Sequence, residues 1–331
     1  MPDESCVIVG AGISGLLAAR ELSDAGWRVT VLDKGRGVGG RMATRRFGGA
    51  GFDHGAQFFT VRDDRFENLV DGWLDAGAAA EWSRGFADAE KNVNPDGHPR
   101  YRGSRGMTSI PKHLAGGLDV RSGEHVVRMD RIGNGWTVAC ESGETVSGNA
   151  LLLTAPVPQS LALAESGNYA LPEDARRQLE EISYDPCVAL MALLDGASPV
   201  PEPGGVQIKG EPLDWIGENA TKGISDRPAL TIHAGPQWSR EHYDDGEADV
   251  TRALLGLAGV QLGADLASAT VETSLARWRY SWVTSSHKEP CLVASEDPPL
   301  VFCGDGFGQP KVEGAALSGL AAADRLLGRE V

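Results

Sequence analysis

The sequence predicts an α/β fold in two parts: a domain built on a parallel sheet, and an inserted α+β domain that carries a mainly antiparallel sheet. Residues 6–33 read as a strand, a helix and a second strand. Residues 300–321 read as another buried strand followed by a helix. Both are parts of a doubly wound sheet, so the chain between them must hold an insertion. The parallel-sheet domain is expected to comprise residues 1–65, 106–158 and 290–331, and the inserted domain residues 66–105 and 159–289.

The first unit has the pattern of a dinucleotide-binding βαβ motif. Residues 6–9 form a short apolar run, as in a buried parallel strand. A helical pattern then ends at Gly26, and a second apolar run ends at Asp33. The turn between strand and helix is GAGISG, residues 10–15, and an acidic residue follows about twenty positions later. The strand, the helix and the acidic residue together predict dinucleotide binding.

Each glycine of this turn has a mechanical reason. Gly10 allows the tight turn, Gly12 lets a pyrophosphate approach the backbone, and Gly15 lets the helix pack closely on the strand. The N–H groups at the helix N-terminus, and its dipole, favour phosphate. Asp33 can accept hydrogen bonds from ribose hydroxyls.

The middle of the chain contains recognisable elements. Residues 120–140 predict paired strands with a turn at residues 133–135, and residues 150–154 predict a further buried strand. Residues 155–158, which hold two prolines, are expected to cross between the domains. Helices are predicted over residues 172–182 and 249–262, around a loop at residues 199–205.

Two further segments predict which dinucleotide is bound. Gly39-Gly40-Arg41 is a pattern shared by FAD enzymes of the amine oxidase type, in which the glycines pass beside the pyrophosphate and the arginine fixes it. Near the C-terminus a buried strand ends in Gly304-Asp305, and a helix rich in small residues begins at Val312. Such enzymes place this aspartate on the ribityl chain and aim the helix N-terminus at the flavin N1–C2=O edge. These anchors predict non-covalent FAD.

Seven motifs, in order along essentially the whole chain, resemble the bacterial renalases. The glycine motifs are generic to FAD enzymes, whereas PLDW and QWSR are more specific. The motifs are DKGRGVGGRM (33–42), DHGAQFFTVRD (53–63), GSRGMTSI (103–110), PLDWIGEN (212–219), HAGPQWSR (233–240), RWRY (277–280) and CGDGFGQPKVEGA (303–315). The resemblance implies an FAD-binding Rossmann-type domain of the p-hydroxybenzoate-hydroxylase and amine oxidase type.

The resemblance also implies an activity. Renalases oxidise 2-dihydro- and 6-dihydro-NAD(P) to NAD(P)+ by hydride transfer to flavin N5, and O2 then takes the electrons to give H2O2. This is metabolite repair. A dihydropyridine becomes aromatic by losing a hydride, and no proton need leave carbon, so the site requires no strong base. It requires a flat slot, polar groups that bind the carboxamide and the ribose, and a geometry that brings C2 or C6 of the ring to flavin N5.

The resemblance, together with residue type, assigns the expected site residues. Those expected in the substrate site are Asn219, His233, Trp278, Tyr280 and Phe59. Those expected to bind FAD are Gly10, Gly12, Ile13, Ser14, Gly15, Asp33, Lys34, Gly39, Gly40, Arg41, His54, Gly55, Ala56, Gln57, Phe58, Val126, Gly304, Asp305, Val312, Glu313, Gly314 and Ala315.

Structural roles compete with these assignments. His233 is also compatible with a hydrogen-bonded histidine at a strand end. Trp278 and Tyr280 alternate with arginines, as in a half-buried strand, so core packing is an alternative. Phe58 and Phe59 are adjacent, so in a strand only one of them can face the flavin.

Composition limits the other partners. The net charge of −15 and the pI near 4.9 argue against nucleic acid. No run of eighteen apolar residues is present, and the acidic N-terminus MPDES lacks the basic start of a secretory signal, so a cytoplasmic protein is expected. The five cysteines show no metal-ligand spacing, and no metal is expected. The expected partners are a dihydronicotinamide dinucleotide and O2. The sequence leaves open whether the protein is a monomer or a weak dimer, and whether its acidic surface reflects a high-salt habitat.

Two other functions compete with the renalase type. The first is a flavin amine oxidase or another FAD oxidase. Amine oxidases often carry a lysine bridged to N5 by water, but Lys209, Lys222 and Lys288 match no such motif. The second is a non-catalytic FAD-binding or redox-sensing protein, whose flavin no dihydronicotinamide would reduce.

Overall fold

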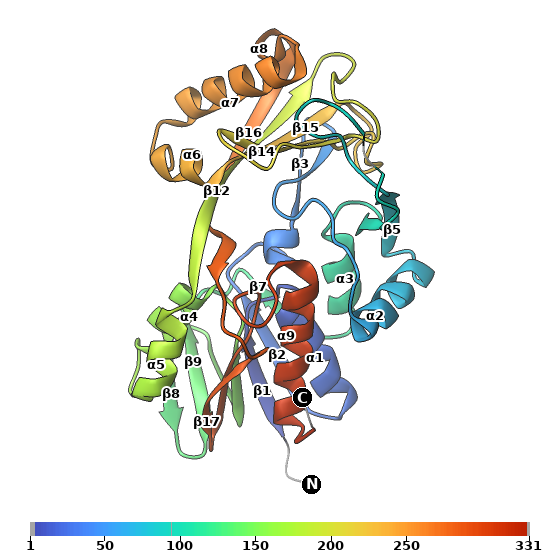
Figure 1. Ribbon diagram of the computed structural model, residues 1–331. Helices are drawn as coiled ribbons and strands as arrows, with labels where there is room; N and C mark the ends of the chain where they lie inside the picture. Colours follow the sequence, from blue (N-terminus) through green and yellow to red (C-terminus); the bar gives the residue numbers. More distant parts are fainter. Residues whose placement is uncertain (1–3, 94, 330–331) are drawn as a thin grey trace.

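The computed structural model describes residues 4–93 and 95–329 and has two domains, one above the other in Figure 1. The predicted domain limits at residues 1 and 331, and most of the acidic N-terminus, lie outside the described residues. The predicted class is confirmed: one domain is built on a mainly parallel sheet and the other on an antiparallel sheet.

The parallel-sheet domain contains a six-stranded sheet in the order β17-β18-β11-β1-β2-β7. All neighbours are parallel except β17, which runs antiparallel to β18. The predicted N-terminal unit and the predicted C-terminal strand are therefore in one sheet, with β11 between β1 and β18. The strands are β1 (Ser5–Val9), β2 (Arg28–Asp33), β7 (Asp119–Ser122), β11 (Ala150–Leu153), β17 (Leu292–Glu296) and β18 (Pro299–Phe302).

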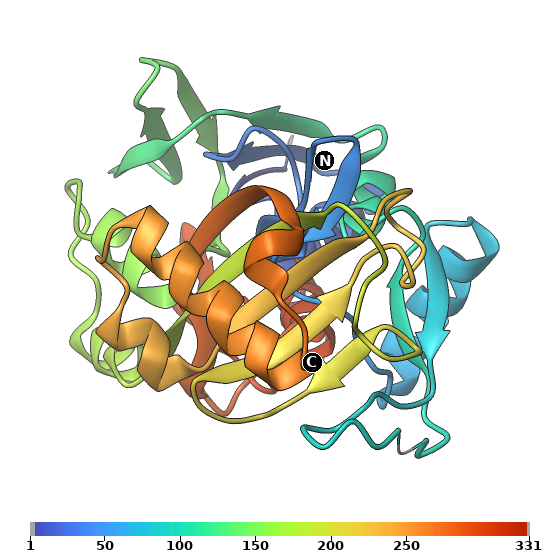
Figure 2. The same ribbon diagram turned by 90° about the horizontal axis from the view of Figure 1, so that it is seen from above.

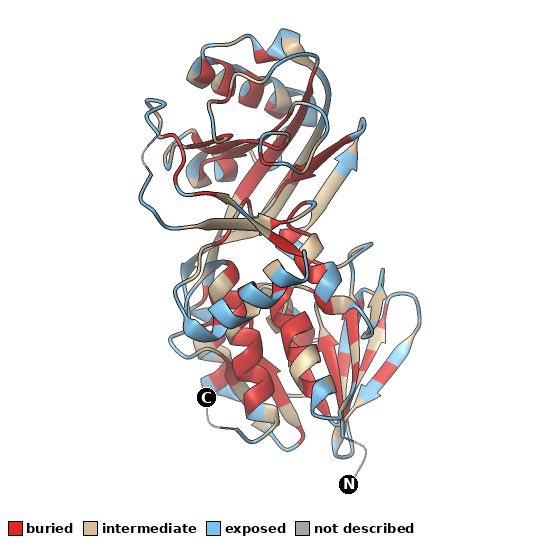
Figure 3. Ribbon diagram, turned by 90° about the vertical axis from the view of Figure 1, so that its right-hand side faces the viewer, coloured by how far each residue is buried: buried red, intermediate tan, exposed pale blue. Residues whose placement is uncertain are grey.

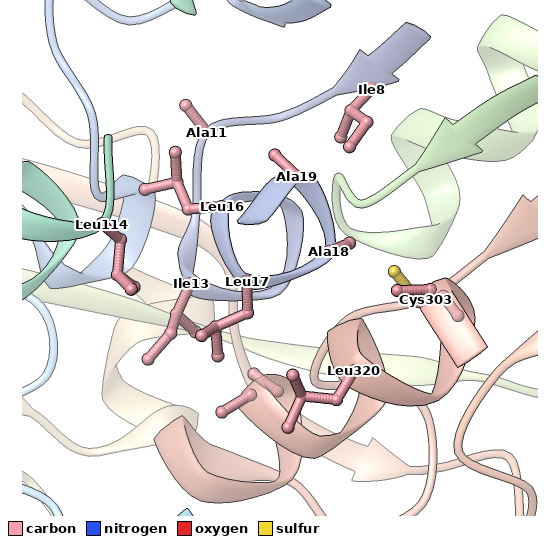
Figure 4. Close-up of a cluster of buried hydrophobic side chains, with 14 of the residues drawn as sticks. Ile8, Ala11, Ile13, Leu16, Leu17, Ala18, Ala19, Leu114, Cys303 and Leu320 are labelled. Atoms are coloured by element: carbon pink, nitrogen blue, oxygen red, sulfur yellow. The ribbon is translucent and has the colours of Figure 1, made fainter. Parts of the chain in front are cut away.

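Both faces of this sheet are covered. Figure 4 shows the core on one face, a cluster of buried side chains that includes Leu16, Leu17, Leu320 and Cys303. The helices on this face are α1 (Ile13–Asp24), α2 (Asp64–Asp75), α3 (Ser109–Ala115) and α9 (Lys311–Leu326). The opposite face packs on a three-stranded sheet and two helices: β8 (Val126–Ile132), β9 (Gly135–Cys140), β10 (Thr145–Gly148), α4 (Val157–Ala164) and α5 (Glu173–Glu180).

The antiparallel-sheet domain has five strands in the order β13-β14-β15-β12-β16. Alternate residues of β12 point to opposite faces: Val188 and Leu190 pack with the helices, whereas Ala189 and Met191 face the other domain. The strands are β12 (Ser183–Leu194), β13 (Gly205–Gln207), β14 (Leu213–Glu218), β15 (Ala229–Ala234) and β16 (Thr270–Ser285), and the helices, seen across the strands in Figure 2, are α6 (Pro236–Glu241), α7 (Glu247–Leu262) and α8 (Leu266–Ala269).

Short elements connect the domains. The hairpin of β3 (Thr44–Phe47) and β4 (Ala50–Asp53) packs Phe47 and Phe52 against the inner face of the antiparallel sheet. A one-turn helix, η1 (Gly40–Met42), precedes it, and a second hairpin pairs β5 (Ala79–Ser83) with β6 (Arg100–Gly103). Figure 3 shows buried residues running through both domains and the region between them.

The expected domain boundaries need correction. Phe66, Val70 and Trp73 lie in the core of the parallel-sheet domain, so α2 belongs there. Helices α4 and α5 also pack on that domain, and residues 155–158 lead into α4 rather than crossing. The crossing comes later, along β12. Apolar periodicity shows that a helix has a buried face, but not which of two cores receives it.

Several local expectations are confirmed. The β8–β9 turn pairs Ile132 with Gly135, and α7 covers the predicted helix at residues 249–262. Gly26 adopts φ 89° just after α1, as a helix-ending glycine should. In the described part of the chain no helix is long and apolar enough to cross a membrane.

Candidate functional site

The glycine turn between β1 and α1 has the expected geometry. Gly10 adopts φ 114°, and a Cβ there would lie 2.3 Å from Thr154 Oγ1. A Cβ on Gly15 would lie 2.1 Å from the Gly10 carbonyl oxygen, so only glycine permits this approach of helix to strand. Around Gly12, by contrast, no atom of the described chain lies within 4 Å of a Cβ position. The space beside Gly12, at the N-terminus of α1, is therefore open, as the close approach of a phosphate requires.

The second glycine segment lies on the first. The Gly39 N–H donates to the Ala11 carbonyl at 2.8 Å, and a Cβ on Gly40 would lie 3.8 Å from Gly12 Cα. Arg41 follows, and its guanidinium forms a two-pronged ion pair with Asp305, with Nη2 2.6 Å from Oδ1. The fold thus joins the two predicted anchors. The pyrophosphate and the ribityl chain are neighbouring parts of FAD, so one ion pair can serve both.

The glycine turns at residues 10–15 and 39–40 and the Arg41–Asp305 pair form a cradle for the predicted cofactor. Asp33 lies at the other end of this cradle and is held by backbone N–H groups. Its Oδ2 accepts from the Ala11 N–H and its Oδ1 from the Gly35 N–H, both at 2.6 Å. The Asp33 carbonyl accepts from the Glu124 N–H at 2.9 Å, which brings the start of β8, with buried Val126, to the end of β2. Each carboxylate oxygen keeps one lone pair for a ribose hydroxyl. Lys34 is exposed and reaches Gln159 at 3.3 Å.

The start of α9 is held by tight packing. A Cβ on Gly314 would lie 1.5 Å from the Gln309 carbonyl oxygen. Ser14 Oγ donates to the Ala315 carbonyl at 2.6 Å, and Ile13 and Val312 are buried in the same core. Glu313 accepts from the Arg62 and Asp63 N–H groups at 2.6 and 2.9 Å. The side chains of these predicted FAD residues stabilise the cradle, which leaves the backbone to face a ligand.

Residues 54–58 run from the cradle to the antiparallel sheet. The Ala56 N–H donates to the Arg41 carbonyl at 2.8 Å, and a Cβ on Gly55 would lie 2.1 Å from that oxygen. The Gln57 amide donates to the Asp53 and Gly55 carbonyls at 2.6 and 3.1 Å. This segment therefore joins the predicted cofactor site to the inner face of the antiparallel sheet.

Two histidines lie at the junction, the place where residues 54–58 reach the inner face of the antiparallel sheet. His233, on β15, has its Nε2 3.5 Å from Gln57 Nε2, and His54 stacks on Trp278 with ring centroids 5.1 Å apart. Burial is the main reason that the pKa of each falls to about 4; Arg45 lowers the pKa of His54 further, and Lys222 contributes at His233. Both imidazoles are neutral at neutral pH and are weak bases.

Three buried polar atoms near this junction have no hydrogen-bond partner within the described chain. They are His54 Nδ1, Gln57 Oε1 and Trp215 Nε1. Buried polar groups are nearly always hydrogen-bonded in folded proteins. A cluster of three without partners is therefore not explained by stability alone and indicates a functional role.

The other predicted substrate-site residues have different surroundings. Trp278 Nε1 donates to the His54 carbonyl at 2.9 Å, and Tyr280 stands edge-on to Tyr184. The Asn219 amide is fully engaged: Nδ2 donates to the Ala229 carbonyl and Thr231 Oγ1, and Oδ1 accepts from the Asp53 N–H. Asn219 thus supports the site from behind; a direct contact with substrate stays a prediction.

Phe59 is not at this junction. It packs against Phe66, Trp73 and Tyr101 in the core of the parallel-sheet domain. Phe58 points the other way and joins Trp82, Phe86 and Trp215. Only one of the two neighbours faces the site, as expected from strand geometry, and it is Phe58. The packing of Phe59 contradicts the place in the substrate site that was predicted for it, and Phe58 becomes the candidate for that place.

Sequence reasoning missed a buried ion pair beside the site. Lys222 Nζ lies 2.6 Å from Asp53 Oδ2, and the two side chains are 1% and 0% exposed. Tyr184 was also missed; its hydroxyl accepts from the Val157 N–H at 3.4 Å, and its pKa is raised by burial and by Asp305. A chain with few lysines makes any lysine conspicuous, but no local pattern points from residue 222 to residue 53.

Positive charge surrounds the junction. Arg45 donates to Ser274 Oγ and the Leu275 carbonyl, and Arg102 to the Gly103 and Ser104 carbonyls. Within the described residues neither arginine has a carboxylate partner. The buried Glu218 accepts only from backbone N–H groups. Three cations, Arg45, Arg102 and Lys222, against two carboxylates, Asp53 and Glu218, leave a net positive charge here. This charge is opposite in sign to the net charge of the whole molecule, so the site favours an anionic ligand.

Comparisons with known proteins place the chain among flavin enzymes. Residues 62–327 match the family described as "Flavin containing amine oxidoreductase", and residues 8–73 match "NAD(P)-binding Rossmann-like domain". Renalase of Mus musculus is 25% identical, over 95% of this chain and 96% of that protein. L-amino-acid oxidase of Mus musculus is 51% identical over 43 residues, 13% of this chain and 7% of that protein.

Solved structures share the fold. Wild-type putrescine oxidase bound to putrescine superposes with a TM-score of 0.72 at 16% identity, covering 98% of this chain and 99% of that one. A triple mutant of the same oxidase reaches a TM-score of 0.74 at 15% identity, covering 99% of each chain. At this identity the likeness concerns the fold alone.

Proposed function

Because this chain belongs to the flavin containing amine oxidoreductase family, we propose that it is an FAD-dependent oxidase of renalase type, which oxidises 2-dihydro- and/or 6-dihydro-NAD(P) to NAD(P)+. The proposal follows the similarity to mouse renalase along nearly the full length of both chains. It also follows the chemistry of the junction between the two domains.

The cofactor is FAD. When bound, it supplies the acceptor for the hydride and passes the electrons to O2, which gives H2O2. The residues that would hold it are the glycines at residues 10–15 and 39–40, the Arg41–Asp305 pair and the segment 54–57. They fit the group, because the space beside Gly12 is open and lies at the N-terminus of α1, where the backbone N–H groups of a helix can bind phosphate.

The charge of the junction is the observation that carries the proposal. Arg45 and Arg102 have no carboxylate partner within the described chain, and Lys222 and Arg45 act on the histidines by lowering their pKa. A substrate that brings a pyrophosphate is attracted by this field, whereas a substrate ammonium ion is repelled. The dinucleotide oxidase is therefore favoured over an amine oxidase.

The acid–base properties of the site agree with this reaction. His54 and His233, with pKa values of about 4, are poor proton acceptors at neutral pH. Oxidation of a dihydropyridine removes no proton from carbon, so weak bases suffice. Neutral imidazoles can still orient a carboxamide by hydrogen bonding, and Trp278 and Phe58 offer flat surfaces on which a pyridine ring can lie.

Two alternatives stay in the test. Amine oxidases often use a lysine near the flavin, whereas the Lys222 ammonium of this chain is bound to Asp53. A non-catalytic FAD-binding or redox-sensing protein would need no substrate slot. Each alternative has its own outcome below.

The deciding experiment mixes the FAD-loaded protein anaerobically with 6-dihydro-NAD and follows the visible flavin band by stopped flow. The same measurement is made with 2-dihydro-NAD, NADH and a panel of amines. We expect fast bleaching by a dihydro isomer alone, with peroxide released once air is admitted. Bleaching by an amine would support an amine oxidase, and bleaching by none of them a binding protein.

His233→Ala belongs to the same experiment. We expect it to slow bleaching by at least tenfold without emptying the cofactor site, because the imidazole meets that site only at Gln57, and the glycine turns and the Arg41–Asp305 pair stay intact. His242→Ala, which removes a half-buried histidine in the turn after α6, is the matched control and should bleach at the wild-type rate. An unchanged rate in His233→Ala would mean that His233 only packs.

A further inference from the structure

The Lys222–Asp53 pair is unusual because it is fully buried. Its Nζ–Oδ2 distance is 2.6 Å, and burial lowers the Lys222 pKa while Asp53 opposes that change. Taking two charges out of water costs several kcal/mol per ion, and apolar residues of the same size often stabilise a protein equally well. Stability alone therefore does not account for the pair.

Asp53 is bound on every polar atom. Its Oδ1 accepts from Thr44 Oγ1 and the Met107 N–H at 2.5 and 2.8 Å, and its Oδ2 from Lys222. Its N–H donates to Asn219, and its carbonyl accepts from Gln57 and Thr231. Asn219, Lys222 and Thr231 come from the antiparallel-sheet domain, so this one residue is held from both domains.

Lys222 is itself held by a rigid turn. The Glu218 carboxylate accepts from the Ala220 and Thr221 N–H groups, and the Lys222 N–H donates to the Glu218 carbonyl at 3.0 Å. The ammonium lies 4.9 Å from the centre of the Trp82 ring. These contacts hold Lys222 in position independently of its ion pair with Asp53.

The residues that follow Asp53 contact the predicted substrate-site residues Trp278 and His233. His54 stacks on Trp278, and Gln57, whose amide donates to the Asp53 carbonyl, faces His233. A displacement of Asp53 would move His54 directly and Gln57 through that hydrogen bond. Misplacement by about 1 Å can cost a reaction on the order of a hundredfold.

We propose that Lys222 is a positioning residue of this site: through its buried ion pair with Asp53, it sets the segment 54–57 against the inner face of the antiparallel sheet. The inference rests on the proposed function only in taking this segment as the place of reaction. Lys222 touches neither substrate nor cofactor in this role.

The test compares three variants of the FAD-loaded protein. Lys222→Met removes the charge and keeps the length of the side chain. Asp53→Asn/Lys222→Met removes both charges, so no uncompensated ion stays buried. Arg65→Met is the control: it breaks another 2.6 Å ion pair with a nearly buried carboxylate, Asp324, which ties α2 to α9 away from the site.

The readouts are the melting temperature, the visible circular dichroism of the bound flavin, and kcat and KM. We expect the double variant to regain most of the melting temperature lost in Lys222→Met, but to keep an altered flavin dichroism and a kcat at least tenfold below wild type, with KM changed less. Arg65→Met should lower the melting temperature and leave the flavin dichroism, kcat and KM unchanged.

Recovery of the wild-type dichroism together with the melting temperature in the double variant would overturn the inference, because the pair would then be purely structural. If Lys222→Met fails to fold, the double variant decides alone. The dichroism needs no substrate, so it tests Lys222 even if no dihydronicotinamide is oxidised, an outcome that would contradict the proposed function instead.

Discussion

At the scale of single residues, the Arg41–Asp305 pair joins segments from the two ends of the chain. Both predicted cofactor anchors end in this pair, and the Arg41 Nη1 also donates to the Tyr280 carbonyl at 3.2 Å. The pair thus connects the cofactor cradle to β16 of the other domain. Its loss should be felt first in cofactor binding.

Asp305→Ala should weaken FAD binding by at least tenfold, because it removes the predicted ribityl contact and leaves Arg41 without its carboxylate. Isothermal titration of the deflavinated protein with FAD measures the effect. Asp324→Ala, which removes another nearly buried paired carboxylate far from the cradle, is the control. It should lower the melting temperature and leave FAD affinity unchanged; equal affinity losses in both variants would count against the anchor.

The two histidines predict a pH dependence of stability. Their pKa values in the folded protein are about 4, whereas free histidine has a pKa near 6.5. The unfolded chain therefore binds more protons between pH 6.5 and 4, and the free energy of unfolding must fall as the pH falls through that window. One fully buried histidine contributes on the order of 3 kcal/mol.

Urea unfolding at several pH values between 4 and 7 measures this slope. His233→Phe should flatten it, since that proton-binding difference is gone. Carboxylates whose pKa is lowered, such as Asp119 and Asp130, contribute mainly at the acidic end of this window and below it, and they are the same in His233→Phe and in the wild type, so the comparison cancels their effect. An unchanged slope in the variant would show that His233 binds its proton over the same pH range in the folded protein as in the unfolded chain.

At the scale of elements, glycines decide how closely the helices approach. Gly314 lies in the first turn of α9, where a Cβ would be 1.5 Å from the Gln309 carbonyl oxygen. Gly256 on α7 is exposed, and no described residue lies within 4 Å of a Cβ there. Gly314→Ala should push the Gly304–Asp305 loop away and lower both the melting temperature and FAD affinity. Gly256→Ala should stabilise the protein by up to about 1 kcal/mol.

Calorimetry of both variants, with and without FAD, tests this contrast. A Gly314→Ala protein that melts and binds FAD like the wild type would show that the loop can yield. The same substitution in two helices thus separates the cost of a collision from the helix preference of alanine.

At the scale of the whole molecule, net charge should govern the response to salt. The chain carries 46 acidic and 31 basic side chains, a formal charge of −15. Self-repulsion weakens as salt shortens the screening length from about 30 Å at 0.01 M to about 10 Å at 0.1 M. Exposed ion pairs weaken too, but each contributes little.

We therefore expect the melting temperature to rise between 0.01 and 0.3 M NaCl by a few degrees, and equally in KCl. Differential scanning fluorimetry measures the trend. A falling melting temperature would mean that the surface ion pairs outweigh the repulsion.

The sequence by itself predicted the cofactor cradle, because part of it lies within one βαβ unit. The positive φ of Gly10, the 2.1 Å between a Gly15 Cβ and the Gly10 carbonyl oxygen, and Asp33 at the end of the second strand all belong to this unit, whose helix and strands the 3.6-residue and two-residue periods identify. The tertiary structure alone decided which core α2, α4 and α5 join, that Phe58 rather than Phe59 faces the site, and that Lys222 pairs with Asp53. These depend on contacts between residues far apart in the chain, where burial and charge act through space and leave no spacing to read.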